Sequence, residues 1–177
     1  MKVMLLRGVN VGGKRRLLMA DVRQLFANKG HSEAETIGAT GVIVYDDPKE
    51  TLQLELPAGI ETLIVDEQVI RAALDNLPDW WRQDDGWRHN AIFLLDNVPA
   101  KKVLQHVGKL NTEYEAVFMT RNIIFWSSSF ADRKGYFKSE YSKLMKNPYY
   151  RQMTIRNGNT LEKILDKAKK MTNFKIN

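Results

Sequence analysis

The sequence predicts an α+β protein whose two halves repeat one order of elements. Short apolar runs that suit strands alternate along the chain with helical stripes, in which apolar residues recur every three or four positions. Each half runs strand, helix, strand, strand, a variable element, strand and helix. The first six follow the order of a ferredoxin-like βαββαβ unit. We therefore expect two ferredoxin-like halves, each an antiparallel sheet with helices packed on it.

The first half is expected over residues 1–77. Strands are predicted over 2–6, 35–37, 42–45 and 60–65. Residues 51–56 alternate as a strand does, although residues 49–51 also suit the start of a short helix. Helical stripes begin near Leu18 and after Asp66, a good N-cap residue, and Gly30 fits the end of the first helix.

A linker is expected over residues 78–88, where Trp80, Trp81 and Trp87 lie among acidic residues. We expect these rings to pack between the halves rather than to stack on bases. The second half, 89–177, carries an extra C-terminal helix. Its strands are predicted over 91–95, 114–119, 123–126 and 151–155, with residues 127–129 leaving the third strand. Helices are predicted after Pro99, over 137–145 and after Asn159.

The amino-acid composition excludes several kinds of functional site. The chain has 177 residues, of which 44% are hydrophobic and 27% charged, as in ordinary globular domains. It contains no cysteine, so disulfides and thiolate catalysis are excluded. Its three histidines (His31, His89 and His106) are not spaced as metal ligands. No apolar run is long enough to cross a bilayer and no signal peptide is visible. We expect a cytoplasmic protein with no metal, cofactor or membrane partner.

The net charge of +6 is unevenly distributed. Residues 1–30 hold seven basic and one acidic residue, residues 31–100 hold four and fourteen, and residues 101–177 hold sixteen and six. Such asymmetry predicts a surface that attracts anions, unless the acidic middle packs beside the basic ends and the fields cancel.

Residues 5–16, Leu-Leu-Arg-Gly-Val-Asn-Val-Gly-Gly-Lys-Arg-Arg, join a strand end to a glycine-rich loop and three consecutive cations. In one interpretation the glycines supply positive φ in a tight crossover and Asn10 hydrogen-bonds the backbone. In the other, successive backbone N–H groups form an anion-binding concavity beside the cations. Both stay open at this point.

The loop also fits the start of the phosphate-binding pattern G-x-x-x-x-G-K-[ST]. That pattern needs a hydroxyl at its eighth position to hold magnesium, and this chain has Arg15 there. Its helix must also begin at the lysine, whereas here the helical stripe begins near Leu18. A nucleotide hydrolase of this type is therefore excluded.

A second polar stretch lies near the C-terminus. In one interpretation Arg156 pairs with a carboxylate such as Glu162 and Asn157 caps the last helix. In the other, Arg156 and Asn157 bind the same anion as the glycine-rich loop. Lys163, Lys167 and Lys170 share a helix face, which is either solvated or a track for phosphates. The candidate ligand-binding residues are Arg7, Asn10, Gly12, Gly13, Lys14, Arg15, Arg156 and Asn157.

These motifs resemble a known family. Residues 5–14 and 19–23 closely resemble the opening of a bacterial family, domain of unknown function 1697. Residues 154–157, with Asn159, Thr160 and Lys163, are similar to its closing motif, and residues 124–126 and 141–143 resemble a subgroup from low-GC Gram-positive bacteria. The resemblance implies a cytoplasmic bacterial protein with a duplicated ferredoxin-like fold, and no particular reaction.

The chain departs from that family's pattern in three places. The family has Gln-Ser-Gly-Asn where this chain has Gly38-Ala39-Thr40-Gly41, and it commonly has Trp at the position of Gly158. Residues 46–60 are shortened. If the polar positions of the family serve a site, that site is altered here.

We expect a cytoplasmic binding protein that holds a phosphate- or carboxylate-bearing ligand at the glycine-rich loop. One alternative is sequence-independent binding of nucleic acid through the basic C-terminal half. The other is an enzyme acting on small phosphorylated substrates. The sequence favours a non-enzyme, because it shows no catalytic carboxylate pair, histidine relay or activated nucleophile, and no catalytic residue is assigned. It leaves the ligand and the oligomeric state open.

Overall fold

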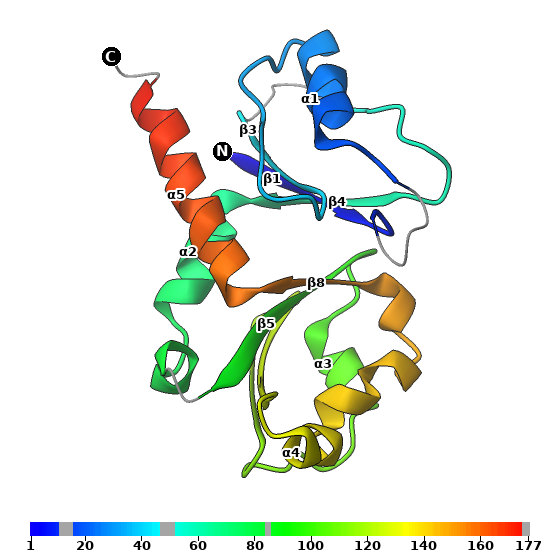
Figure 1. The fold of residues 1–177 in the computed structure, drawn as a ribbon, viewed down its shortest axis with the longest axis vertical. Coiled ribbons are helices and arrows are strands. Elements are labelled where there is room, and N and C mark those ends of the chain that lie inside the picture. The colour runs from blue at the N-terminus through cyan, green and yellow to red at the C-terminus, as the bar shows by residue number, and fades with distance from the viewer. Residues whose placement is uncertain (11–15, 47–51, 84–85, 175–177) are drawn as a thin grey trace. The chain divides into compact units, whose positions relative to one another are not determined.

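The computed structural model describes residues 1–10, 16–46, 52–83 and 86–174 (Figure 1). It contains two four-stranded antiparallel sheets together with helices, so the predicted α+β class is confirmed. Contacts divide the chain into two compact units, residues 1–72 with 160–177 and residues 73–159. Each unit holds one of the sheets.

The first sheet has the strand order β2-β3-β1-β4. Its strands are β1 (Lys2–Arg7), β2 (Glu35–Thr36), β3 (Val42–Tyr45) and β4 (Glu61–Asp66). The central strand β1 pairs with β3 and β4 on its two sides, so that Val3 lies opposite Val44 and Val65. All four residues from Val3 to Leu6 are buried, which accounts for the uninterrupted apolar run in the sequence.

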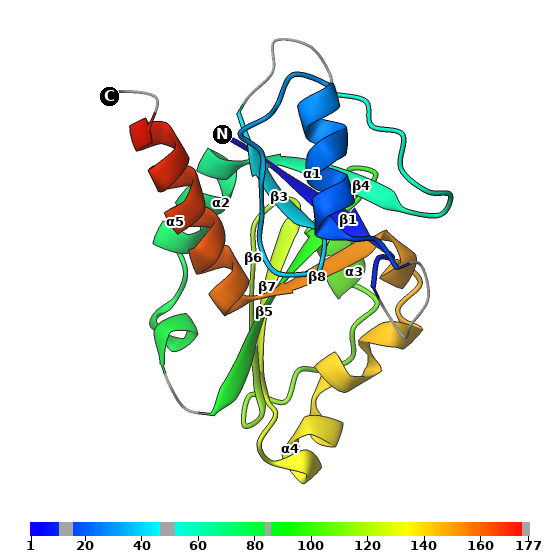
Figure 2. The ribbon, with the colours of Figure 1, turned by 45° about the horizontal axis from the view of Figure 1, so that its top comes forward.

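Helix α1 (Met19–Asn28) covers one face of this sheet (Figure 2). Val22 and Phe26 are fully buried, and they share a core with Met4, Leu6 and Tyr45. The rings of Phe26 and Tyr45 meet edge to face, with 4.9 Å between their centroids. Burying each such side chain contributes about 1.5–3 kcal/mol relative to exposure.

The strand that alternation predicted over 51–56 is wrong for the part that the structure describes. Residues 52–56 form no strand. Leu52, Leu54 and Leu56 nevertheless pack against the first core while Gln53 and Glu55 are exposed. The alternation therefore indicates an extended segment that packs one face on the core. This segment is not paired with a strand of the sheet.

The second sheet repeats the relative strand order of the first, β6-β7-β5-β8. Its strands are β5 (Trp87–Leu94), β6 (Glu115–Met119), β7 (Ile123–Ser129) and β8 (Met153–Asn157). Helix α3 (Ala100–Leu104) and the 3-10 helix η2 (Glu140–Lys146) supply Val103 and Leu144 to the core over Ile92 and Trp126. Helix α4 (Arg133–Lys138) and the 3-10 helix η3 (Tyr150–Gln152) complete the connection from β7 to β8.

Two predictions in this half are corrected. Residues 127–129 do not leave the strand, because β7 continues through three buried serines to Ser129, opposite Trp87. The helix predicted over 137–145 is two short helices, which meet at the extended residue Ser139. The Ser139 hydroxyl donates to the carbonyl of Tyr136 at 2.6 Å, an alternative to helical bonding that serine offers readily.

A helix follows each sheet. Helix α2 (Glu67–Asp75) begins after Asp66, whose carboxylate accepts from the backbone N–H of Gln68 at 3.0 Å, as expected of an N-cap. The 3-10 helix η1 (Asp79–Arg82) follows. Helix α5 (Gly158–Phe174) comes after β8, and from Thr160 onward it belongs by its contacts to the first unit. In the first half the order departs from βαββαβ, since the described residues between β3 and β4 contain no helix.

A buried carboxylate holds the second unit together. Glu115 is 1% exposed and accepts four N–H bonds, from the indole of Trp126 and from the backbone of Asn111, Glu140 and Tyr141, at 2.9–3.2 Å. A buried carboxylate is stable only when its lone pairs are satisfied in this way. The interaction joins β6, β7 and the start of η2.

We expect Glu115→Gln to lower the free energy of unfolding by about 3 kcal/mol, because an amide N–H₂ then faces two N–H donors. Urea denaturation measures the loss. Glu113→Ala, which removes an exposed glutamate two residues away, is the control and should stay within about 0.5 kcal/mol of the parent. Equal stability of the two variants would contradict a structural role for Glu115.

Tyr141 should contribute to the dependence of stability on alkaline pH. Burial raises the pKa of its hydroxyl from 10.0 to about 12. The unfolded chain therefore loses this proton at lower pH than the folded chain, so the contribution of Tyr141 to stability is fully present below pH 10 and is lost as pH rises toward 12. The difference corresponds to something on the order of 2–3 kcal/mol.

The measurement is the unfolding free energy of the parent and of Tyr141→Phe from pH 8 to pH 12. Both chains carry every other titrating group, so the difference between their curves isolates Tyr141. We expect the parent to fall relative to the variant above about pH 10. Parallel curves would show that the hydroxyl titrates alike in both states.

Candidate functional site

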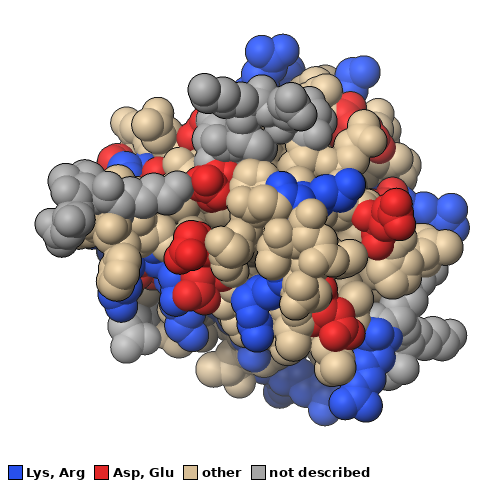
Figure 3. Space-filling model, turned by 90° about the horizontal axis from the view of Figure 1, so that it is seen from above, with Lys and Arg blue, Asp and Glu red and all other residues tan. Residues whose placement is uncertain are grey.

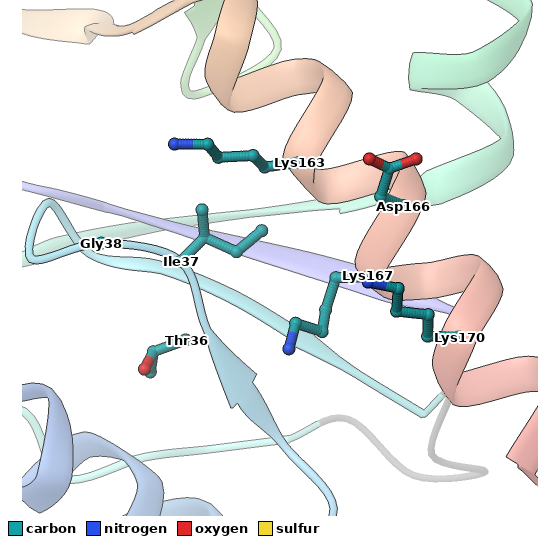
Figure 4. Close-up of a pocket in the computed structure, with 7 residues that line it drawn as sticks. All are labelled: Thr36, Ile37, Gly38, Lys163, Asp166, Lys167 and Lys170. Carbon is teal, nitrogen blue, oxygen red and sulfur yellow. The ribbon is translucent and has the colours of Figure 1, made fainter.

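A pocket of about 310 Å³ lies in the first unit, between α5 and the end of β2 (Figure 4). The β2 side supplies Thr36, Ile37 and Gly38. The helix side supplies Lys163, Asp166, Lys167 and Lys170. Two segments more than a hundred positions apart in the sequence thus form one concave surface.

The charge of the pocket comes from the helix. Lys163, Lys167 and Lys170 follow the spacing i, i+4 and i+7, which places them on one face. Figure 4 shows Lys163 and Lys167 reaching from α5 toward the segment from Thr36 to Gly38. With Asp166 as the one acidic lining residue, the lining carries three positive charges and one negative charge. This arrangement suits an anion.

Two further charged groups lie at the edge of the pocket. Arg23 of α1 donates to the Thr36 hydroxyl at 2.7 Å, which brings a guanidinium next to the lining. Glu35 lies 3.7 Å from the ammonium of Lys167. The Glu35 side chain is about half exposed, so water screens this pair and it contributes little to stability.

The turn from Gly38 to Gly41 fixes the β2 wall of the pocket. Gly41 has φ +72°, and a Cβ there would lie 2.6 Å from the Cβ of Leu6 and 2.8 Å from a methyl of Val9. Leu6 also donates its N–H to the Gly41 carbonyl at 2.7 Å. Only glycine fits this approach, and the turn is held against β1.

The glycine-rich loop is described at its two ends. Arg7 forms an ion pair with Glu61, its cross-strand neighbour on β4. Gly8 has φ +84°, in keeping with the tight crossover expected of the glycines. Gly12, Gly13, Lys14 and Arg15 lie outside the described residues, and their predicted contact with an anion stays a prediction.

Asn10 bonds the backbone, the arrangement given by the first of the two interpretations of the loop. Its amide nitrogen donates to the carbonyls of Leu17 and Ala39, at 3.0 and 2.7 Å, and its oxygen accepts from the N–H of Leu17 at 2.9 Å. Asn10 itself has φ +53°, a conformation that asparagine tolerates better than most residues. The side chain thus joins both ends of the loop to the Gly38–Gly41 turn.

Arg156 and Asn157 belong to β8, in the second unit. Arg156 is 8% exposed and donates to the Thr154 hydroxyl at 3.0 Å and to the Ile155 carbonyl at 2.7 Å. Burial lowers the pKa of its guanidinium from 12.5 to about 10. Asn157 is exposed at the strand end. The predicted meeting of this pair with Arg7 over one anion stays a prediction.

Sequence reasoning did not find a serine–histidine contact on the second sheet. Nδ1 of His89 lies 2.5 Å from the Ser127 hydroxyl, and Nε2 lies 3.2 Å from the Gln83 carbonyl. Ser127 is fully buried and the ring of Trp81 lies against His89, with 5.1 Å between the centroids, so a substrate has no access to this hydroxyl. The pair is a structural hydrogen bond across β5 and β7.

The sequence does not predict the pocket as a unit, although it indicates part of the lining. The spacing of the lysines predicts the basic face of α5, and the Gly38–Gly41 turn departs from a family pattern. No feature of a single sequence says that the two lie together.

The described residues contain no cluster of three metal-binding side chains, and none of their helices combines the length and apolar character needed to cross a membrane.

Surface charge is mixed on the face shown in Figure 3. Acidic side chains lie among the basic ones over most of this face, so neighbouring charges oppose one another there. A local concave lysine cluster is therefore a more specific signal for an anion than the net charge of +6.

Comparison with known proteins gives a family and a structural neighbour. Residues 1–125 match the family model described as "Protein of unknown function (DUF1697)". A solved structure of a conserved bacterial protein from Streptococcus pneumoniae is similar, with a TM-score of 0.80 and 29% identity over 94% of this chain and 97% of that one. A search of curated proteins finds no match.

We expect Asn10→Ala to lower the unfolding free energy by about 2 kcal/mol, because two carbonyls and one N–H lose their partner. Asn10→Gly is the control for backbone strain, since glycine adopts positive φ freely but also lacks the amide. Thermal and urea unfolding measure both. Equal stability of the parent and of Asn10→Ala would show that these bonds contribute nothing, because alanine loses the bonds without relieving the positive φ.

Proposed function

The chain belongs to the family of proteins of unknown function DUF1697, and we propose that it binds a small phosphate- or carboxylate-bearing anion. The observation that carries this proposal is the lysine-lined pocket between α5 and the Thr36–Gly38 segment. It combines three ammonium groups on one helix face with a hydroxyl and a backbone turn on the opposite wall.

Volume and charge both support a small ligand. About 310 Å³ is at the lower end of the range for small-molecule sites and holds a compact anion such as a sugar phosphate or a tricarboxylate. Each lysine offers three rotatable donors, which satisfy the several oxygens of such a group. Arg23, next to Thr36, is placed to add a fourth cation.

The glycine-rich loop is a second candidate site for the same class of anion. Lys14, Arg15 and the glycine N–H groups supply anion-binding chemistry that the composition of the loop favours. The described ends of the loop support a structural contribution, because Asn10 bonds backbone and Arg7 pairs with Glu61. The experiment therefore includes an arm for the loop.

The test is isothermal titration with inorganic phosphate, pyrophosphate and citrate at low salt, using the parent and single lysine variants. We expect Lys163→Ala and Lys170→Ala each to weaken binding about tenfold, the value of a charge-assisted hydrogen bond of roughly 1.5 kcal/mol. Lys169→Ala is the matched control: it removes an exposed lysine of the same helix that does not line the pocket.

Three other outcomes are decisive. No binding of any probe would overturn the proposed function. Equal losses in the Lys163 and Lys169 variants would reduce the effect to net charge. Loss of binding in Lys14→Ala with normal binding in Lys163→Ala would move the site to the glycine-rich loop and overturn the pocket.

We also propose that the two halves are diverged copies of a ferredoxin-like unit, joined within residues 78–88, and that the chain acts in the cytoplasm. The same relative strand order in both sheets supports the duplication. The absence of cysteine fits a reducing compartment.

A further inference from the structure

A cluster of aromatic rings and cations lies on the surface of the second unit, apart from the residues that line the pocket. It is formed by the end of β7, by α4 and by the start of β5. Phe130 is 44% exposed and Phe137 is 61% exposed, and Tyr136 lies between them. Exposed phenylalanines are costly in water, and two on one short stretch call for a partner.

The three rings form a continuous edge-to-face chain. Phe130 and Tyr136 have centroids 5.6 Å apart at an interplanar angle of 74°, and Tyr136 and Phe137 are 5.4 Å apart at 70°. The contacts hold the rings in fixed orientations, which lowers the entropy lost when a planar ligand stacks on them.

Cations lie over two of these rings, Phe130 and Phe137, and over the neighbouring ring of Tyr114. The guanidinium of Arg88 lies 3.3 Å from the centroid of Phe130, and that of Arg133 lies 5.9 Å from the centroid of Phe137. Lys138 lies over the ring of Tyr114 and donates to its hydroxyl at 3.2 Å. Together with Lys134 these give four exposed basic side chains.

Two acidic residues, Asp132 and Glu113, lie near Lys138, against four basic side chains in the cluster. Asp132 is the N-cap of α4, and its two oxygens accept from the backbone N–H groups of Lys134 and Gly135 at 2.9 Å. Its charge is thereby directed at the helix terminus rather than at a ligand. The cluster remains basic, with ring faces interleaved among the cations.

We propose that this surface, defined by Arg88, Phe130, Arg133, Tyr136, Phe137 and Lys138, binds single-stranded nucleic acid without sequence preference. Unpaired bases stack on aromatic rings and on guanidinium planes, while lysine and arginine contact the phosphates. Residues 130–138 supply both kinds of group, with aromatic rings at 130, 136 and 137 and cations at 133, 134 and 138.

Two other polyanions fit less well. Double-stranded nucleic acid offers phosphates but keeps its bases stacked, so the exposed phenylalanines would gain nothing from it. An acidic peptide matches the cations but lacks the planar faces that suit fixed rings. The proposal is independent of the anion pocket, which lies in the first unit.

The test is fluorescence anisotropy of a labelled twelve-nucleotide thymidine strand at low salt. Matched probes are an abasic strand of the same length, a duplex and a twelve-residue glutamate peptide. We expect Phe137→Ala to weaken binding of the thymidine strand roughly five- to hundredfold, the range for losing one base stack. Binding of the abasic strand should be weaker than that of the thymidine strand and unaffected by the substitution.

Controls separate this surface from general effects. Met145→Ala removes an even more exposed apolar side chain outside the cluster and should leave binding unchanged. Lys163→Ala tests the anion pocket and should also leave it unchanged. Phe137 is exposed, so its variant is expected to keep the fold, which circular dichroism checks.

The proposal is overturned if the thymidine strand does not bind at low salt. Equal binding to the parent and to both Phe137→Ala and Phe130→Ala would also overturn it. So would binding of the glutamate peptide as tight as that of the thymidine strand, because charge alone would then account for the interaction.

Discussion

The carboxylate of Glu115 is the constraint on which the second unit depends. A negative charge at 1% exposure has to be surrounded by donors, and the four N–H groups that satisfy it come from separate segments of the chain. Two of them, at Glu140 and Tyr141, fix where η2 begins. Helix α4, which carries Tyr136 and Phe137, ends at Lys138, two residues before this contact.

Sheet order is the second constraint. In both sheets the first strand of the unit lies in the centre and pairs with the third and fourth. One edge of the first sheet is the two-residue strand β2, which offers little unpaired backbone. A short β2 also makes room for the pocket, because the chain leaves the ladder after Thr36 and turns at Gly38.

Much of the fold could be predicted from the sequence, because an element that is buried on one face has apolar residues at regular spacing. The runs around Val3 and Val42, and the stripe through Val22 and Phe26, marked a strand, a strand and a helix correctly. The errors share a cause: Leu52, Leu54 and Leu56 alternate without pairing, and Ser127 to Ser129 are polar yet lie inside a strand. The local pattern of apolar and polar residues indicates which side chains are buried, whereas the pairing of strands depends on residues far away in the sequence.

The candidate site was less predictable, since it joins positions far apart in the chain. The lysine spacing on α5 was readable, but its approach to Thr36 and Gly38 depends on the tertiary fold. The cations and glycines of the glycine-rich loop predict an anion site by their composition alone. Where the structure describes that stretch, Asn10 and Gly8 serve the backbone, and their chemistry is that of a turn.

The close approach of Gly41 to Leu6 and Val9 makes the two walls of the pocket differ in rigidity. One wall, at Thr36 to Gly38, leads into a turn whose Gly41 lies so close to Leu6 and Val9 that a methyl group has no room there. The other consists of long lysine side chains that can adopt many rotamers. An anion bound there as proposed would meet adjustable side chains on one side only, and each adjustment would cost side-chain entropy. The pocket would then select ligands by the number and spacing of their negative charges more than by their shape.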